Sequence, residues 1–158
     1  MRGVLRQVMS LWLLLPVVFR LVAPIGIMLV LWLFSSAPPP PQTGTQLRAL
    51  LHNCAHVVAY FGLGGAWTMA LLRRERLPGS GASFRVAVAS VSLAVVYGLI
   101  DEWHQSFVPG RCCSVWDLLT DLCGSALAVS FLWWTFSGAA RFAVRAGCFL
   151  GLGLSCAA

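Results

Sequence analysis

The chain has 158 residues, of which 59% are hydrophobic and only 10% are charged, and its net charge of +6 comes from arginine without any lysine. A soluble domain normally carries about a quarter charged residues, so the composition excludes an ordinary soluble domain and favours a lipid bilayer. Because the arginines flank apolar segments, their charge indicates membrane topology, and we expect no nucleic-acid partner. The six cysteines show neither a C-x-x-C zinc pairing nor a disulfide framework.

The N-terminal segment, residues 1–20, is apolar but contains Pro16 and Arg20, and three interpretations of it stay open. Residues 4–19 can form an interfacial helix, or the first span can start near Leu13 with Arg20 reaching the cytoplasmic surface. The segment can also be a cleaved signal peptide, although no small-residue cleavage site precedes a soluble domain. The first predicted span is residues 21–36, and the proline-rich loop APPPPQTGTQ follows it.

Three further apolar stretches, at about 52–72, 84–100 and 115–136, each approach the roughly 20 residues that a helix needs to cross a bilayer. The predicted fold class is therefore all-α, an integral membrane four-helix bundle that occupies residues 21–136. Residues 137–158 form a short, apolar, glycine-rich tail, which either lies on the membrane or makes a poor fifth span. The pattern does not determine the oligomeric state.

The positions of the arginines predict the orientation of the spans. With the N-terminus in the cytoplasm, only Arg48 and Arg111 fall on the outer side, and the other arginines lie on or near the cytoplasmic side. This bias predicts a multi-pass protein with both termini in the cytoplasm. The proline-rich loop and the polar stretch 97–111 then face the extracytoplasmic side.

Polar side chains gather at the outer ends of the last three predicted spans. Four of the five acidic residues lie between positions 101 and 121, and His52, His56 and Tyr60 share one helical face because they are four residues apart. Since polar groups that face lipid are costly, we expect these side chains to face one another in an outer-leaflet pocket. The candidate pocket residues are His56, Tyr60, Asp101, Glu102, His104, Gln105, Arg111, Asp117 and Asp121.

Several of these residues also have a plainer interpretation. Asp117 suits the N-terminus of the fourth span through the helix dipole, and Arg111 can pair with Asp117 or Asp101 to fold the loop. Glu102 can point to water, and His52 can be an ordinary interfacial residue. Three residues are interpreted as backbone devices for a tight return of the chain into the membrane: Gly98, Pro109 and Gly110.

A metal site is a further interpretation of these polar residues. His56, His104, Asp101 and Glu102 are residue types that bind metals. However, the D-E-x-H motif lacks the H-E-x-x-H spacing that places two histidines on one face of a helix. We therefore expect neither a metal nor another cofactor.

Three stretches together resemble the VanZ-like family of bacterial membrane proteins: HVVAYFGLG at 56–64, YGLIDEWHQSFVPGR at 97–111 and SVWDLLTDLCG at 114–124. The resemblance covers roughly residues 52–130, with the order and spacing of the motifs kept. The positions that match the family pattern are His56, Tyr60, Gly62, Gly98, Asp101, Glu102, Gln105, Pro109, Gly110, Arg111, Asp117 and Gly124.

The chain departs from the family pattern at two places. The family often has an Asp-Lys pair before its histidine, where this chain has His52 and Asn53, and it has an asparagine where this chain has Asp121. Both departures change the charge of the expected pocket. His52 and Asp121 can form a substitute pair.

The resemblance implies a four-helical protein of the bacterial inner membrane with a role in the cell envelope. The family is named for a protein linked to low-level resistance to the glycopeptide teicoplanin. We therefore expect the outer polar site to bind or modulate a lipid-linked, surface or glycopeptide ligand.

Whether the protein is an enzyme stays open. In the enzymatic alternative, Asp101 or His104 acts as a base on a lipid or glycolipid head group, and Arg111 holds a phosphate or carboxylate. A less favoured alternative is a small transporter in which His56 and Asp121 titrate within the membrane.

Overall fold

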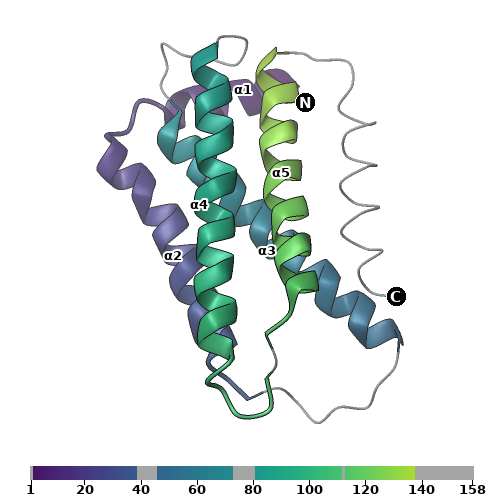
Figure 1. The fold of residues 1–158 in the computed structure, drawn as a ribbon. Helices are drawn as coiled ribbons and strands as arrows, with labels where there is room; N and C mark the ends of the chain where they lie inside the picture. Colours follow the sequence, from purple (N-terminus) through teal and green to yellow (C-terminus); the bar gives the residue numbers. More distant parts are fainter. Residues whose placement is uncertain (1, 39–45, 73–80, 112, 138–158) are drawn as a thin grey trace.

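The computed structural model describes residues 2–38, 46–72, 81–111 and 113–137, which form helices and short connections without any strand (Figure 1). The predicted all-α fold class is confirmed. The tail that begins after residue 137 lies outside the described residues. In chain order the helices are α1 (Arg2–Trp12), α2 (Val17–Ser35), α3 (Gln46–Leu71), α4 (Gly81–Gln105) and α5 (Val115–Ser137).

Helices α2 to α5 form the bundle, and each is long and apolar enough to cross a membrane. Helix α3 is central, because it packs against α2, α4 and α5, and α4 also packs along α5 (Figure 1). Large apolar side chains such as Phe19, Leu33 and Val58 remain exposed on the outside of the bundle. Such a surface suits lipid rather than water.

The closest approach of two backbones is between α3 and α5. A Cβ atom on Gly124 would lie 2.5 Å from the carbonyl oxygen of Val57, and one on Gly64 would lie 2.7 Å from Cα of Ser125. Only glycine fits at these two positions, and small residues allow the same close packing between many membrane helices. The contact brings the N-terminal halves of α3 and α5 close enough for their polar side chains to meet.

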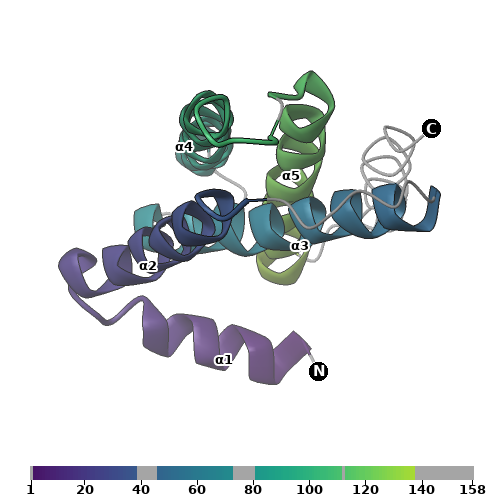
Figure 2. The same ribbon diagram turned by 90° about the horizontal axis from the view of Figure 1, so that it is seen from below.

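The N-terminal segment forms a separate helix, α1, that runs across one end of the bundle. Figure 2 shows α1 along its length, whereas α4 is seen nearly end-on. A turn then leads through Pro16 into α2, which begins at Val17, earlier than the span expected from residue 21. A separate N-terminal helix is therefore present, as the interpretation of residues 4–19 as an interfacial helix expected. It begins at Arg2 and ends at Trp12, so it is shorter than expected.

Arg20 lies within α2 and does not reach the surface, which corrects the interpretation of it as a surface-seeking residue. Its side chain is only 8% exposed, and its Nη1 donates to the carbonyl oxygens of Leu72 at 2.5 Å and Met69 at 3.2 Å. The last carbonyl groups of a helix lack partners within the helix and carry its negative dipole end, so a buried cation is favourable there. Arg20 thereby joins the start of α2 to the end of α3.

Helix α4 continues beyond the expected end of its span at Ile100 and ends at Gln105. The polar residues 101–105 therefore lie on the last turn of a helix and not in a loop. Helical backbone keeps its own hydrogen bonds satisfied while the side chains find partners on neighbouring helices. The chain then turns back through Gly110, whose φ of 83° is the left-handed conformation expected of a turn glycine.

Candidate functional site

Polar side chains collect at the end of the bundle where α2 and α4 end and α3 and α5 begin, which is the lower end in Figure 1. Buried groups at this end include Ser35, Asp101, Glu102, Gln105 and Asp121. They come from three of the four long helices. The site is therefore built by the tertiary arrangement and not by a single motif.

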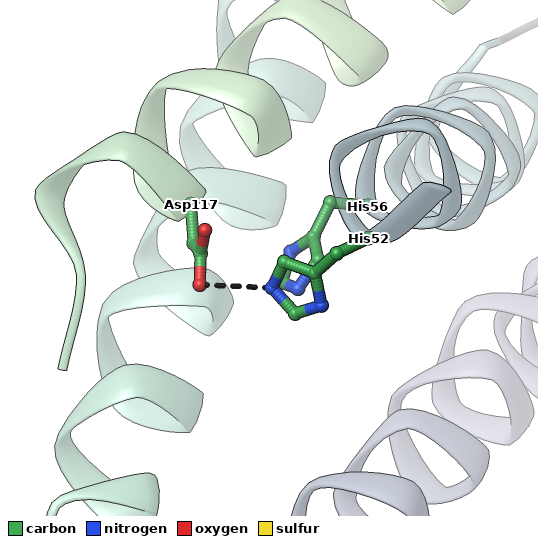
Figure 3. Close-up of side chains that lie close together, drawn as sticks. All are labelled: His52, His56 and Asp117. Carbon is green, nitrogen blue, oxygen red and sulfur yellow. Dashed lines mark hydrogen bonds and ion pairs between the residues drawn. The ribbon is translucent and has the colours of Figure 1, made fainter. Parts of the chain in front are cut away.

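Two histidine–aspartate pairs join α3 to α5. Nε2 of His52 lies 3.3 Å from Oδ2 of Asp117, and Nδ1 of His56 lies 2.8 Å from Oδ1 of Asp121 (Figure 3 shows the outer pair). The histidines are four residues apart on one helix and the aspartates four apart on the other, so the pairs stack one turn above the other. The suggested pairing of His52 with Asp121 is wrong, since each residue has a different partner.

Asp121 is the deepest carboxylate of the site, with 1% of its surface exposed. The Tyr60 hydroxyl lies against it, in addition to His56. A Cβ atom on Gly98 would lie 2.8 Å from Oδ2 of Asp121 and 3.2 Å from the Tyr60 hydroxyl. Gly98 therefore makes room for the carboxylate from within α4, which corrects its interpretation as a device for the return of the chain.

A second polar group links α2 to the end of α4. The buried Asp101 carboxylate accepts hydrogen bonds from Oγ of Ser35 at 2.6 Å and from Nε2 of Gln105 at 2.8 Å. Oε1 of Gln105 in turn accepts from Nη1 of Arg111 at 3.1 Å. Both oxygens of Asp101 are thus satisfied by neighbouring side chains, which fixes the position of α2 against α4.

Arg111 contacts the end of α2 and pairs directly with neither Asp117 nor Asp101, contrary to the plainer interpretation. Its Nε donates to the carbonyl oxygen of Ala37 at 3.1 Å, and its Nη2 donates to that of Phe34 at 3.0 Å. These carbonyls belong to a helix end that needs donors. Arg111 therefore folds the 106–111 turn onto α2.

Glu102 is 4% exposed and does not point to water, which corrects the expectation of a solvated side chain. Its Oε2 accepts a hydrogen bond from the backbone N–H of Ser114 at 2.8 Å, and its Oε1 has no partner among the described residues. Oγ of Ser114 accepts from the N–H of Asp117 at 3.3 Å, which caps the start of α5. Glu102 thus holds the end of α4 against the start of α5.

His104 faces α2 and stands apart from the histidines of α3. Its ring stacks on Trp32 with centroids 3.8 Å apart and an interplanar angle of 23°. Its Nδ1 is buried without a partner among the residues that the structure describes. The geometry gives His104 a packing role between α4 and α2.

A cavity of about 860 Å³ opens between α2, α3 and the end of α4. Its walls along α2 and α3 consist of apolar side chains and of glycines, which have no side chain. They include Val22, Gly26, Val30, Val58 and Gly62. Its other end is polar. The polar lining consists of Ser35, His52, His56, Tyr60, Asp101, Gln105 and Arg111.

The nine candidate residues therefore divide among three places. His56, Tyr60, Asp101, Gln105 and Arg111 line the cavity, and Asp121 lies behind the first two. The rest do not line it: Glu102 and Asp117 join the helix ends beside it, and His104 stacks on Trp32.

Two polar residues that line the cavity, His52 and Ser35, are not among the nine candidates. The i, i+4 spacing of His52 and His56 did point to His52, although the plainer interpretation made it an ordinary interfacial residue. No sequence signal pointed to Ser35, since its role depends on where α2 meets α4.

Carboxylates gather at this end of the bundle, where Asp101, Glu102, Asp117 and Asp121 lie at the end of α4 and in the first two turns of α5. Their effect reaches the loop before α5. Desolvation and the neighbouring Glu102 carboxylate raise the pKa of the Cys113 thiol, although the residue as a whole is exposed. That thiol therefore stays protonated at neutral pH.

Four apolar helices of membrane length with a buried polar site at one end define a polytopic membrane protein. A family model described as VanZ/LLP1 matches residues 9–137, which is most of the chain. The chain therefore belongs to this family, as its motifs indicated. No curated protein and no solved structure matches the chain significantly.

Proposed function

We propose that the protein binds an amphiphilic, lipid-linked ligand of the bacterial cell envelope from the outer leaflet of the inner membrane. By holding this ligand it alters the access of glycopeptides of the teicoplanin type to their target and contributes to resistance. The cavity between α2 and α3, apolar along its walls and polar at one end, carries the proposal.

The shape of the cavity supports a ligand with two chemically different ends. Its volume of about 860 Å³ lies within the range of small-molecule sites, which is roughly 300–1,000 Å³. Gly26 and Gly62 leave the apolar walls open, and a Cβ atom on Gly26 would meet nothing within 4 Å. An alkyl chain suits this part, while the hydroxyl, imidazole and carboxylate groups at the polar end suit a head group.

The arginine distribution supports the outer leaflet. It predicts that the polar end of the bundle faces the extracytoplasmic side and that both termini lie in the cytoplasm. A glycopeptide acts outside the cytoplasm, so a ligand held at this end lies on the same side as the drug.

A substitution that fills the apolar part of the cavity tests ligand binding. We expect Gly26→Leu to reduce the amount of co-purified lipid on the order of tenfold, the effect of about 1.4 kcal/mol of lost interaction. Native mass spectrometry of the protein released from detergent measures the bound lipid. The matched control is Gly3→Leu, since Gly3 also has open space around it but lies on α1, away from the cavity. Equal lipid content in both variants would contradict the proposal.

Drug susceptibility tests the physiological part separately. Expression of the protein in a teicoplanin-susceptible host should raise the inhibitory concentration of teicoplanin, and Gly26→Leu and Asp101→Asn should lower it again at equal protein level. Gly3→Leu should behave as the wild type. An unchanged susceptibility with the wild type refutes the resistance role even if lipid binding is found.

The enzymatic alternative receives less support from the residues first assigned to it. Asp101 accepts hydrogen bonds with both oxygens, His104 is stacked on Trp32, and the donors of Arg111 contact protein acceptors. Binding is therefore the function that the geometry favours. Turnover of labelled lipid-linked precursors by the purified protein would overturn this preference.

A further inference from the structure

Three potential metal ligands meet where α3 and α5 begin. His52, His56 and Asp117, here called the ligand trio, each offer one ligand atom, and these atoms lie within 4.8 Å of one another. Figure 3 shows both imidazole rings on α3 turned toward the carboxylate on α5. The rings also lie against each other, with centroids 4.6 Å apart.

One pair of these atoms already has the spacing of a tetrahedral metal site. Ligand atoms about 2.0–2.1 Å from a zinc ion at tetrahedral angles are about 3.3 Å from one another. Nε2 of His52 and Oδ2 of Asp117 are already 3.3 Å apart. The two histidines also have the i, i+4 spacing by which one helical face binds a metal with both imidazoles.

A fourth side chain prepares His56 for this role. Nδ1 of His56 lies 2.8 Å from Oδ1 of the buried Asp121, and because an ionised carboxylate only accepts hydrogen bonds, the ring nitrogen is assigned as the donor. This bond leaves the proton on Nδ1 and the lone pair on Nε2, which is the nitrogen free to bind a metal. Metal-binding histidines usually have such a carboxylate behind them, and it fixes both the tautomer and the orientation of the ring.

We propose that the ligand trio binds a divalent transition-metal ion of the zinc class, with Asp121 as the residue that orients His56. Two imidazole nitrogens and one carboxylate oxygen are a ligand set that suits zinc. The site is accessible, since the His52 side chain is 49% exposed and that of Asp117 is 14% exposed.

This site replaces the expectation of no metal. That expectation rested on the D-E-x-H motif of α4, whereas the ligands come from α3 and α5. Three protein ligands leave a fourth position open. Two of the ligand residues, His52 and His56, also line the cavity, so the trio adjoins the proposed ligand site. If the proposed ligand binding holds, an anionic oxygen of the head group binds at the open fourth position in place of water.

Metal binding by the full-length protein tests the proposal directly. The protein is purified in detergent without a histidine tag, stripped with a chelator and titrated with Zn²⁺ by calorimetry, and with Co²⁺ by visible absorption. We expect one zinc ion per chain and the intense absorption of tetrahedral Co²⁺. His52→Ala, His56→Ala and Asp117→Asn should each abolish the absorption, and Asp121→Asn should weaken zinc binding by about 10–100-fold.

His104→Ala is the matched control, because His104 is a histidine at the same end of the bundle that faces Trp32. It should bind zinc as the wild type does. Thermal unfolding without metal shows whether each variant is folded, and zinc should raise the Tm of the wild type but not that of Asp117→Asn. Absence of stoichiometric zinc binding, or binding that survives His52→Ala and Asp117→Asn, overturns the proposal.

The metal-site proposal and the lipid-binding proposal can be refuted independently of each other. Gly26→Leu should retain zinc binding while it loses lipid, since Gly26 is on α2 whereas the metal ligands come from α3 and α5. A zinc-free wild type that retains lipid would refute the metal site and leave the lipid proposal standing.

Discussion

At the residue scale, Gly98 illustrates how the site shapes its surroundings. A glycine inside a helix costs about 1 kcal/mol relative to alanine, and Gly98 lies well within α4. Its missing side chain makes room for the Asp121 carboxylate and the Tyr60 hydroxyl. The polar contacts of α3 and α5 therefore determine which residue α4 can accept at this position.

Gly98→Ala should lower the free energy of unfolding by about 1–3 kcal/mol, because the new methyl group would overlap Oδ2 of Asp121 at 2.8 Å. Thermal or chemical unfolding in detergent measures the change. Gly62→Ala is the control, since its Cβ would only touch Cδ1 of Ile27 at 4.0 Å. That variant should be stabilised by up to about 1 kcal/mol through helix propensity. A Gly98→Ala protein as stable as Gly62→Ala would show that the carboxylate is not held where the structure has it.

At the element scale, helix ends are held by side chains from other helices. Arg20 of α2 donates to the last carbonyls of α3, and Arg111 donates to the last carbonyls of α2. Glu102 of α4 accepts from the first backbone N–H before α5. These contacts follow the sign of each helix dipole, with cations at carboxyl ends and a carboxylate at an amino end. In the described part of the chain, charge thus serves to fix helix ends as well as to build the polar site.

Arg20→Met should destabilise the protein by about 1.5–3 kcal/mol, because it leaves the carbonyls of Met69 and Leu72 without their charged donor. Methionine keeps much of the side-chain length, so the loss reports on the hydrogen bonds. The exposed Arg85 on α4 provides the matched control. Arg85→Met should change stability by no more than about 0.5 kcal/mol. Equal effects of the two substitutions would mean that the Arg20 contacts do not stabilise the bundle.

At the scale of the whole molecule, the polar end and the α1 end of the bundle are opposite each other (Figure 1). The arginine bias predicts that the polar end faces outward and that α1 lies on the cytoplasmic side. Between these ends the bundle exposes apolar side chains toward lipid. The orientation of the bundle in the membrane can therefore be tested by labelling one surface position at each end.

Cysteine labelling in intact cells tests this orientation. In a chain whose only cysteine is Cys113, a membrane-impermeant maleimide applied at mildly alkaline pH should react from outside, since Cys113 is exposed in the loop before α5 and the alkaline pH offsets its raised pKa. In a chain whose only cysteine comes from Ser10→Cys on α1, the reagent should react only after the membrane is permeabilised. Labelling of the Ser10→Cys protein in intact cells would reverse the predicted topology.

The sequence by itself determined the all-α class, the family, the number of long apolar helices and the gathering of polar residues near their ends. Hydropathy, arginine position and motif spacing are local properties, and each can be read along the chain without knowing which helices touch. The span expected to end at Ile100 is shorter than α4, which ends at Gln105, because hydropathy does not show that the polar residues 101–105 find partners on α2 and before α5.

Only the tertiary structure decided which polar groups meet. His52 pairs with Asp117 and His56 with Asp121, because glycines let α3 and α5 approach closely enough to set the two helices in this register. Hydrogen bonds depend on the rotation and tilt of whole helices, and these follow from side-chain packing along their full length. That dependence on distant contacts is the physical reason why the residue types of the site were predictable and their partners were not.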